Sequence, residues 1–338
     1  MAIRTAIIGY GRSGSKLHAD PLEALPEYEV VAVCDPDKER QKKAYQRFGC
    51  STYNNLSSLF KKEKIDLACI ITRSDQHVSM AIEAMKKGVH VLVTKPMAIN
   101  AVQVKKMLDA SKKYKRILAP WQPSRWGTDF TQIKKIIAEG KIGEAFSIQR
   151  NFLFYDVRDD WQTKSKFGGG YLLNWGPHLI DQVIELVNEP VESVWGKLWQ
   201  AINPGDVEDS IKTILAFKNS DIIGEINIGI GAEQLPRWFI QGSLGTITSD
   251  EKYIYVVVPK KKQQFVTGIP GNSEKRDVIE RTPVGKFIYG DASVIYLELA
   301  QAIHGEKSFS VTPESVLNLM KVLDTVRESN KKGSTIKL

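Results

Sequence analysis

A glycine pattern near the start of the chain constrains its fold more than any other feature. The apolar run Ala6-Ile7-Ile8 leads directly into Gly9-Tyr10-Gly11-Arg12-Ser13-Gly14, and the next apolar run is followed by Asp35, 21 residues after Gly14. A G-x-G-x-x-G pattern between a strand and a helix, with an acid at this distance, is typical of the turn that holds the pyrophosphate of a dinucleotide. The first glycine permits a tight turn, the second lets the pyrophosphate approach the backbone, and the third lets the helix pack on the strand. The sequence therefore predicts a Rossmann-type dinucleotide-binding domain.

Asp35 bears on which dinucleotide is bound. It follows the apolar run 30–34, where a carboxylate can accept hydrogen bonds from the adenosine ribose hydroxyls and repel a 2′-phosphate. We therefore expect NAD as the cofactor in preference to NADP. Lys38 and Arg40 follow closely and could neutralise a phosphate, although a solvated helix face is the simpler interpretation of both.

The first 120 residues alternate short apolar runs with helical patterns. We expect strands at residues 3–8, 30–34, 67–72, 89–94 and 117–119, and helices at 13–25, 38–48, 56–62, 77–87 and 101–114. This alternation predicts an α/β fold with a doubly wound parallel sheet in a first domain, residues 1–120. Ligands bind at the carboxyl ends of such strands, which here carry Gly9, Asp35, Thr72 and Thr94-Lys95-Pro96.

From about residue 120 the pattern changes. We expect helices at 129–139 and 177–187, and strands at 145–154, 191–198, 211–217, 222–230, 238–242, 246–249 and 253–259. Consecutive strands without intervening helices predict a second, α+β domain over residues 121–338 with a mostly antiparallel open sheet. Residues 265–286 are rich in glycine, proline and charge and are expected to form a loop. Helices at 293–303 and 312–329 close the chain, and the last can pack back on the first domain.

The composition is that of a folded globular protein, because 42% of the 338 residues are hydrophobic. The start of the sequence lacks a signal-peptide pattern, and no apolar run approaches the roughly 20 residues that cross a bilayer. We therefore expect a cytoplasmic protein with no membrane partner. Cys34, Cys50 and Cys69 are odd in number and lack C-x-x-C spacing, which favours reduced core thiols over a disulfide or a metal site.

The formal net charge of +8 raises the question of nucleic-acid binding. The basic residues lie in short clusters, such as 86–87, 112–113 and 260–262, and acidic residues are interspersed among them. Scattered clusters of this kind are typical of solvated helix faces. We therefore expect no nucleic-acid partner.

Two groups of residues have the chemistry of a reaction site. Lys95 follows a strand at the same sheet edge as the glycine loop, where its charge would stabilise an oxyanion beside a nicotinamide. An ordinary surface lysine explains that position equally well. Asn174 and His178 are four residues apart, after three consecutive glycines at 168–170, and would project to one side of a helix. Histidine can shuttle a proton near neutral pH and asparagine can hold a substrate hydroxyl, so we favour a site over a buried structural histidine.

Together, these residues make the sequence resemble the Gfo/Idh/MocA family of NAD(P)-dependent oxidoreductases over essentially its full length. The resemblance rests on the glycine loop followed by His18, the turn at 72–77, the run 88–96, the pair Arg125-Trp126 and the segment 176–181. Within the family the sequence is most similar to the branch of scyllo-inositol dehydrogenases. The family acts mainly on sugars, inositols and their derivatives, so the resemblance implies hydride transfer between NAD and a hydroxyl or keto carbon of such a substrate.

The resemblance also implies roles for the matching residues. Lys95 matches the lysine that orients substrate and cofactor, His178 matches the histidine that takes the hydroxyl proton, and Asn174 is expected to act with them. Further contacts to the cofactor are implied for the glycine loop and for Asp35, Thr72, Arg73, Ser74, His77, Thr94 and Pro96. Contacts to the substrate are expected from Lys95, Trp161, Asn174, Trp175, His178, Arg125 and Tyr155.

Two departures from the family pattern concern these residues. Thr94 stands where the family usually has glutamate, and Asn174 stands where it usually has aspartate. Losing two negative charges should lower the proton affinity of Lys95 and His178. Because that pair is present, we expect a dehydrogenase acting on CH–OH groups. The alternative is a catalytically silent NAD-binding regulatory protein of the same fold.

Family members commonly associate through the open face of the second domain's sheet, which implies a homodimer or homotetramer. The apolar alternation in residues 222–230 is compatible with such a face. Burial under the chain's own helices is the plainer explanation of that alternation.

Overall fold

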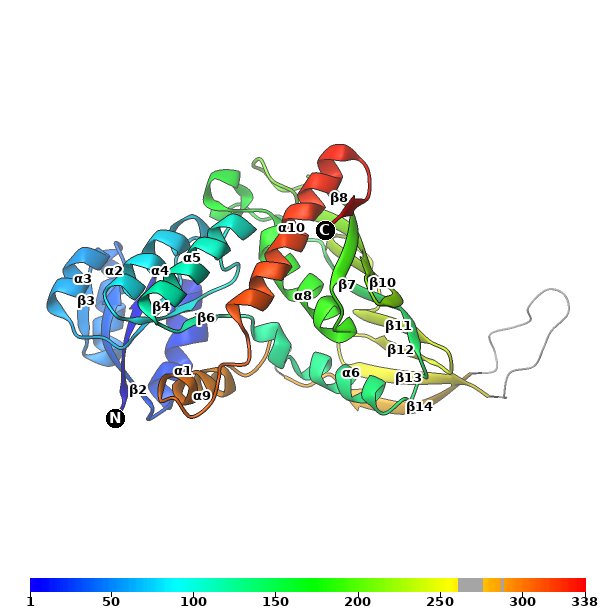
Figure 1. The fold of residues 1–338 in the computed structure, drawn as a ribbon, viewed down its shortest axis with the longest axis horizontal. Helices are drawn as coiled ribbons and strands as arrows, with labels where there is room; N and C mark the ends of the chain where they lie inside the picture. Colours follow the sequence, from blue (N-terminus) through cyan, green and yellow to red (C-terminus); the bar gives the residue numbers. More distant parts are fainter. Residues whose placement is uncertain (261–275, 287–288) are drawn as a thin grey trace, which may run out of the picture. The chain divides into compact units, whose positions relative to one another are not determined.

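The protein folds into two compact units, shown in Figure 1 as a computed structural model that describes residues 1–260, 276–286 and 289–338. The first unit contains Met1–Pro123 together with two later segments, Asp160–Pro177 and Gly290–Asp324. The second unit contains Ser124–Asp159, His178–Tyr289 and Thr325–Leu338. The compact unit around the N-terminal sheet thus includes segments from well beyond residue 120.

The first unit is built on a six-stranded parallel sheet in the order β3-β2-β1-β4-β5-β6. Its strands are β1 (Ile3–Ile8), β2 (Tyr28–Cys34), β3 (Ser51–Tyr53), β4 (Leu67–Ile70), β5 (His90–Val93) and β6 (Leu118–Pro120). This is the strand order of a Rossmann fold, in which the chain changes direction between β1 and β4 and ligands bind at that point. The predicted α/β class and doubly wound sheet are confirmed.

Helices connect these strands (Figure 1). A π-helical turn (Ser13–His18) continues into α1 (Ala19–Ala24), and α2 (Lys38–Phe48), α3 (Leu56–Lys62), α4 (His77–Lys86) and α5 (Ala101–Tyr114) follow. The helix predicted at 13–25 is therefore not a regular α-helix, because its first six residues form a wider turn. A short 3₁₀ turn at Ser74–Gln76 precedes α4. Later segments add α7 (Tyr171–Asn174), α9 (Ala292–Ile303), the start of α10 (Pro313–Lys332) and short 3₁₀ turns at Trp161–Thr163 and Ser165–Phe167.

The core of the first unit includes α9, although this helix lies far along the chain. Its Tyr296 is fully buried, and the Tyr28 hydroxyl donates to the Tyr296 carbonyl oxygen at 2.6 Å. The Tyr296 hydroxyl lies 2.8 Å from Nδ1 of His18, whose ring packs 4.4 Å from the ring of Trp121. The start of α10 is held as well, because the backbone N–H of Ala101 donates to an Asp324 carboxylate oxygen at 2.8 Å. Both C-terminal helices thus contribute to this unit.

The second unit contains a nine-stranded sheet in the order β14-β13-β12-β11-β7-β10-β9-β8-β15 among the described residues. Every neighbouring pair is antiparallel except β7 and β10, which run parallel. Its strands are β7 (Ala145–Phe154), β8 (Val191–Trp199), β9 (Ser210–Phe217), β10 (Ser220–Ile230), β11 (Trp238–Gly242), β12 (Thr246–Ser249), β13 (Tyr253–Pro259), β14 (Arg276–Pro283) and β15 (Ile336–Lys337). The mostly antiparallel sheet predicted for the C-terminal half is confirmed.

One face of this sheet is covered by α6 (Thr128–Ala138), α8 (Gly176–Val187) and the end of α10. Glycines mark two close approaches, because a Cβ at Gly224 would lie 2.7 Å from Val183 and one at Gly196 would lie 2.8 Å from Val326. In β10 the alternating Gly224, Ile226 and Ile228 are buried while Ile223 is exposed. The apolar alternation at 222–230 is therefore explained by the chain's own helices.

The largest error of the sequence-based prediction concerns the strand β14. Residues 276–283 were expected in a loop but form this strand, which pairs with β13 at the edge of the sheet. Its residues are mostly exposed and include four charged side chains, so no apolar alternation marks it. Residues 265–275 of that predicted loop lie outside the described part of the chain, and residues 284–286 follow β14 without regular structure. The short strands β3 and β15 were also missed.

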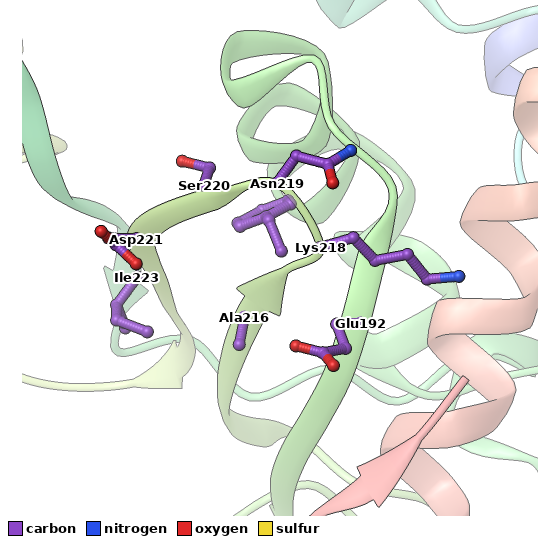
Figure 2. A pocket seen from close by; sticks show the side chains of 8 residues that line it. Glu192, Ala216, Lys218, Asn219, Ser220, Asp221 and Ile223 are labelled. Atoms are coloured by element: carbon purple, nitrogen blue, oxygen red, sulfur yellow. The ribbon is translucent and has the colours of Figure 1, made fainter.

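A shallow hollow of about 420 Å³ lies at the turn between β9 and β10 (Figure 2). Figure 2 shows Lys218 and Asn219 at this turn and Glu192 on the neighbouring strand. None of the residues predicted to form the reaction site lines this hollow. Within the described residues, no helix combines the length and the apolar character that crossing a membrane requires.

Candidate active site

The glycine loop forms a cradle that only glycine can build. Gly9 has φ of +94°, and a Cβ at this position would lie 2.6 Å from the carbonyl oxygen of Ile71. A Cβ at Gly14 would lie 2.0 Å from the carbonyl oxygen of Gly9. At Gly11 a Cβ would meet only the Arg40 guanidinium, at 3.7 Å, among the described residues. The loop is therefore closed where the chain packs on itself and open at the second glycine, which fits the pyrophosphate of a dinucleotide.

The sheet brings Asp35 to this loop. Its side chain is 2% exposed, and its carboxylate accepts hydrogen bonds from the backbone N–H groups of Tyr10 at 2.7 Å and Asp37 at 3.0 Å. Nη1 of Arg40 lies 3.4 Å from the same carboxylate. The acid therefore holds the glycine loop against the end of β2, at the position where the adenosine ribose of a dinucleotide is expected.

A second loop, residues 72–77, lies at the end of β4, and His77 anchors it. Its two ring nitrogens lie 3.0 Å from the carbonyl oxygens of Thr72 and Pro96. Burial lowers the pKa of His77, and hydrogen bonding to the two carbonyls opposes that shift. His77 thus connects the loop after β4 to the segment that carries Lys95. Ser74 is buried, and Gly168 packs closely on it. A Cβ added at Gly168 would lie only 3.0 Å from the Cβ of Ser74.

Arg73 joins the same loop to the segment at 160–177. Its guanidinium lies 4.1 Å from the centre of the Phe167 ring and 3.2 Å from a carboxylate oxygen of Asp75. Trp161 is partly exposed and begins the 3₁₀ turn Trp161–Thr163 of this segment. The first unit therefore gathers the residues predicted to contact the cofactor around the carboxyl ends of β1, β2, β4 and β5.

Lys95 follows β5, after Thr94, and is held by the segment that contains Asn174. Its Nζ donates to the Asn174 carbonyl oxygen at 2.7 Å and to the Asn174 side-chain oxygen at 2.9 Å. The ammonium also lies 5.7 Å from the centre of the Trp175 ring. In addition, the side-chain amide of Gln122 donates to the carbonyl oxygen of Pro177 at 2.6 Å. The structure thus brings Lys95, Asn174 and Trp175 together, and Asn174 supplies two neutral acceptors where the family usually places a carboxylate.

His178 lies in the second unit, on α8, and is 5% exposed. Its Nδ1 lies 3.1 Å from the hydroxyl oxygen of Ser124, and its ring centre is 5.2 Å from that of Tyr289. The side chain of Gln182 donates to the Ser124 carbonyl oxygen at 3.0 Å and accepts from Nε of Arg150 at 3.0 Å. A chain of hydrogen bonds therefore fixes the elements that orient the histidine.

Sequence reasoning missed Ser124, Gln182 and Tyr289. Gln182 is four residues after His178 on the same helix, so helical spacing could have identified it. Ser124 precedes Arg125 in the segment that opens the second domain, but no pattern marks a lone serine. Tyr289 lies in an irregular segment, so only the tertiary structure reveals its contact with His178.

Arg125 and Tyr155 occupy different surroundings from His178. The Arg125 guanidinium makes two hydrogen bonds to the Asp181 carboxylate, at 2.7 and 2.8 Å, and lies 3.2 Å from Glu185. Burial by itself would lower the pKa of Arg125, but Asp181 and Glu185 together outweigh it, so the pKa is raised. This ion cluster fixes the start of the second unit to α8. Tyr155, just after β7, is 64% exposed.

Comparison with known families agrees with this geometry. Residues 3–121 match the family model described as "Oxidoreductase family, NAD-binding Rossmann fold", and residues 130–248 match the "GFO/IDH/MocA C-terminal domain". The chain belongs to the Gfo/Idh/MocA family. The predicted family is therefore confirmed, as is an NAD-binding Rossmann domain. These results make the protein a member of an oxidoreductase family with NAD as its cofactor.

Individual relatives span nearly the whole chain. The protein is 25% identical over 350 residues to the uncharacterized oxidoreductase YdgJ of Escherichia coli, covering 99% of this chain and 98% of the relative. It is 25% identical over 349 residues to the scyllo-inositol 2-dehydrogenase (NADP(+)) IolW of Bacillus subtilis, covering 99% and 96%. A solved NAD-binding protein from Listeria innocua superposes with a TM-score of 0.88 at 27% identity, covering 100% of this chain and 97% of that one. The similarity to IolW supports the predicted inositol dehydrogenase branch.

Proposed function

We propose that this protein is an NAD-dependent dehydrogenase that transfers a hydride between the nicotinamide and a hydroxyl or keto carbon of a sugar, inositol or related polyol. The observation that carries the proposal is the fixed ammonium of Lys95, held by both oxygens of Asn174 beside the cofactor-binding loops. A relative over nearly the full chain is named for scyllo-inositol as its substrate, which supports a cyclic polyol or sugar. In this proposal residues 1–120 bind the cofactor, and residues 121–338 serve substrate binding and oligomerisation.

Each side chain has a defined task in this reaction. Bound NAD supplies the hydride acceptor. In this proposal Nδ1–H of His178 donates to the Ser124 hydroxyl oxygen, so that Nε2 accepts the proton of the substrate hydroxyl. Lys95 places a positive charge on the substrate oxygen and stabilises the negative charge that develops there. Asn174 holds the lysine in place and offers its amide N–H group to a neighbouring hydroxyl.

The test is a screen of polyols and keto-sugars with NAD(H). The kcat/KM of the Lys95→Ala and His178→Ala variants is then measured with the best substrate. We expect each variant to lose at least about a hundredfold in kcat/KM, as expected for removal of a proton-transfer or oxyanion-stabilising group. His304→Ala, a change on the surface at the end of α9, should leave kcat/KM within about twofold, since surface changes are usually near neutral. Unchanged activity in the Lys95→Ala, His178→Ala double variant would rule out this pair as the reaction site.

The substitution of Asn174 for the usual acid gives a second test. Asn174→Asp adds a carboxylate within hydrogen-bonding distance of the Lys95 ammonium, and a negative charge favours the protonated forms of neighbouring bases. We expect the acid limb of the pH profile of kcat/KM to move toward higher pH. An unmoved profile would contradict the assignment of Asn174 to the site.

The second candidate function is a catalytically silent NAD-binding regulatory protein, favoured by the replacement of two acids by Thr94 and Asn174. It predicts tight NAD binding without turnover on any polyol or keto-sugar, together with a protein partner whose binding depends on NAD. Turnover on any substrate that depends on Lys95 would exclude it.

We also propose a homodimer or homotetramer that forms through the open face of the second unit's sheet. That face carries the exposed apolar side chains of Trp199 and Ile223, beside a hollow lined in part by Leu153 and Leu235. Exposed apolar patches of this kind mark association surfaces. Light scattering should give an oligomer for the wild type and a smaller species for Ile223→Glu. A monomeric wild type would contradict the proposal.

A further inference from the structure

Arg40 lies over the open part of the glycine loop. It sits in the first turn of α2, and its Nη1 and Cζ atoms are 3.7 and 3.8 Å from the position of a Cβ at Gly11. The same guanidinium pairs with Asp35 at 3.4 Å and with Asp37 at 3.5 Å. Its side chain is 49% exposed, so solvent and ligands can reach it. Apart from the adjoining Tyr10 and Arg12, no other described residue lies within 4 Å of that Cβ position.

Lys38 has the same charge and lies on the same helix, yet its contact is different. Its Nζ lies 3.4 Å from the side-chain oxygen of Gln41, whose amide in turn donates to the Asp35 carbonyl oxygen at 2.6 Å. The two basic residues that follow β2 are therefore not equivalent. Arg40 is the one that combines contact with the acid and with the glycine loop.

This arrangement changes the charge that a bound nucleotide meets. A buried carboxylate at the end of β2 repels a phosphate on the ribose 2′ position, whereas a nearby arginine accommodates it. Arg40 offsets part of the negative charge of Asp35 and Asp37, and two backbone N–H groups already donate to the Asp35 carboxylate. The guanidinium also has several N–H donors in a planar fork that matches phosphate oxygens.

We propose that Arg40 is a cofactor-specificity residue that neutralises Asp35 and contacts the ribose 2′-phosphate, so that this protein binds NADP as well as NAD. The proposal rests on the cofactor site of the proposed function but not on the reaction, so it can be tested by binding alone. In this proposal the ribose hydroxyls of NAD would contact Asp35, and the 2′-phosphate of NADP would contact Arg40. Specificity is thus set by a pair of opposite charges and not by the acid alone.

The experiment compares dissociation constants of NADH and NADPH for the purified protein, measured by nucleotide fluorescence and by calorimetry. We expect the wild-type constants to agree within about tenfold, which is about 1.4 kcal/mol. Arg40→Ala should weaken NADPH binding by at least about tenfold and change NADH binding by less than about threefold, because a charge-assisted bond to phosphate is lost. Lys38→Ala is the matched control and should leave both constants unchanged.

Two further measurements separate the 2′-phosphate from the rest of the nucleotide. Adenosine 2′,5′-bisphosphate should compete better than 5′-AMP with the wild type and lose that advantage in Arg40→Ala. Arg40→Lys should restore part of it, because the charge returns without the planar fork. Circular dichroism spectra of the variants establish that α2 and the sheet remain folded.

Several results would overturn the proposal. If Arg40→Ala weakened the binding of NADH and NADPH equally, the guanidinium would contact a part of the molecule that both nucleotides share. Unchanged binding in that variant would make Arg40 a solvated surface residue. A wild type that rejects NADPH by more than about a hundredfold would show that Asp35 alone sets the preference. If the wild type bound neither nucleotide, the cofactor site itself would be wrong, whereas binding without turnover would contradict only the proposed reaction.

Discussion

His18 makes the stability of the first unit depend on pH, and the size of the effect follows from its surroundings. Its side chain is fully buried, and burial lowers its pKa to about 3 from an ordinary value of 6.5. The Tyr296 hydroxyl donates to the sulfur of Cys69 at 3.5 Å, so its oxygen accepts from Nδ1–H of His18. Nε2 is buried and has no hydrogen-bond partner among the described residues. The folded protein therefore holds a neutral imidazole.

The sign of the effect follows from this difference in proton affinity. Below pH 6.5 the unfolded chain binds a proton that the folded protein excludes until the pH approaches 3. The contribution to stability is thus fully present above pH 6.5 and is lost as the pH falls toward 3. One group with these two pKa values costs about 1 kcal/mol at about pH 5.5 and about 3 kcal/mol at about pH 4.5.

His18→Asn isolates this term, because asparagine keeps a donor close to the Nδ1 position and does not titrate. Its smaller side chain should lower the free energy of unfolding by roughly 1–3 kcal/mol at every pH. Urea unfolding followed by far-ultraviolet circular dichroism would give the free energy of unfolding of both proteins between about pH 7.5 and 4.5. The advantage of the wild type should shrink by the amounts given above. A difference between the two proteins that stays constant with pH would refute the reasoning.

Three further outcomes can be checked. Gly14→Ala should abolish NADH binding measured by fluorescence, because its Cβ would lie 2.0 Å from the Gly9 carbonyl oxygen and displace the loop. Trp238→Phe should lower the free energy of unfolding by roughly 1–3 kcal/mol in urea, because the buried Asp129 carboxylate would lose the indole N–H donor at 3.0 Å. The three buried cysteines, whose pKa values burial raises to about 11 or 12, should react with Ellman's reagent far more slowly in the folded protein than in urea.

The elements that were predicted well are those whose local pattern is strong. The helix at 101–114 and the strand at 145–154 have the predicted bounds, because one face of each is mostly apolar at the appropriate spacing. The helix at 38–48 also has the predicted bounds, because Asp37 caps its start and Gly49, in the left-handed conformation, ends it. The strand β14 was missed because it lies at a sheet edge and exposes charged residues on both faces. Its structure depends on pairing with β13, which is not encoded in its own pattern.

In the candidate active site, too, some residues were predicted from sequence patterns and others were revealed only by the structure. Lys95 and Asn174 were predicted from the family pattern, and the structure joins them by two hydrogen bonds. Their roles in the reaction, and that of His178, remain predictions. No local signal pointed to Ser124 or Tyr289 as neighbours of the histidine, because the segments that carry them are far from it in sequence.

The sequence by itself determined the cofactor domain, because the glycine loop and its acid act through spacing that is local to one strand, turn and helix. Such a pattern of closely spaced glycines after a strand can be identified without knowing which distant segments pack on it. Only the tertiary structure decided that α9 belongs to the first unit, that His18 is buried against Tyr296, and that Arg40 lies over Gly11 beside Asp35. These contacts depend on how elements distant in sequence pack against one another and on which side chains meet where they pack. The sequence pattern of a single segment does not determine this packing.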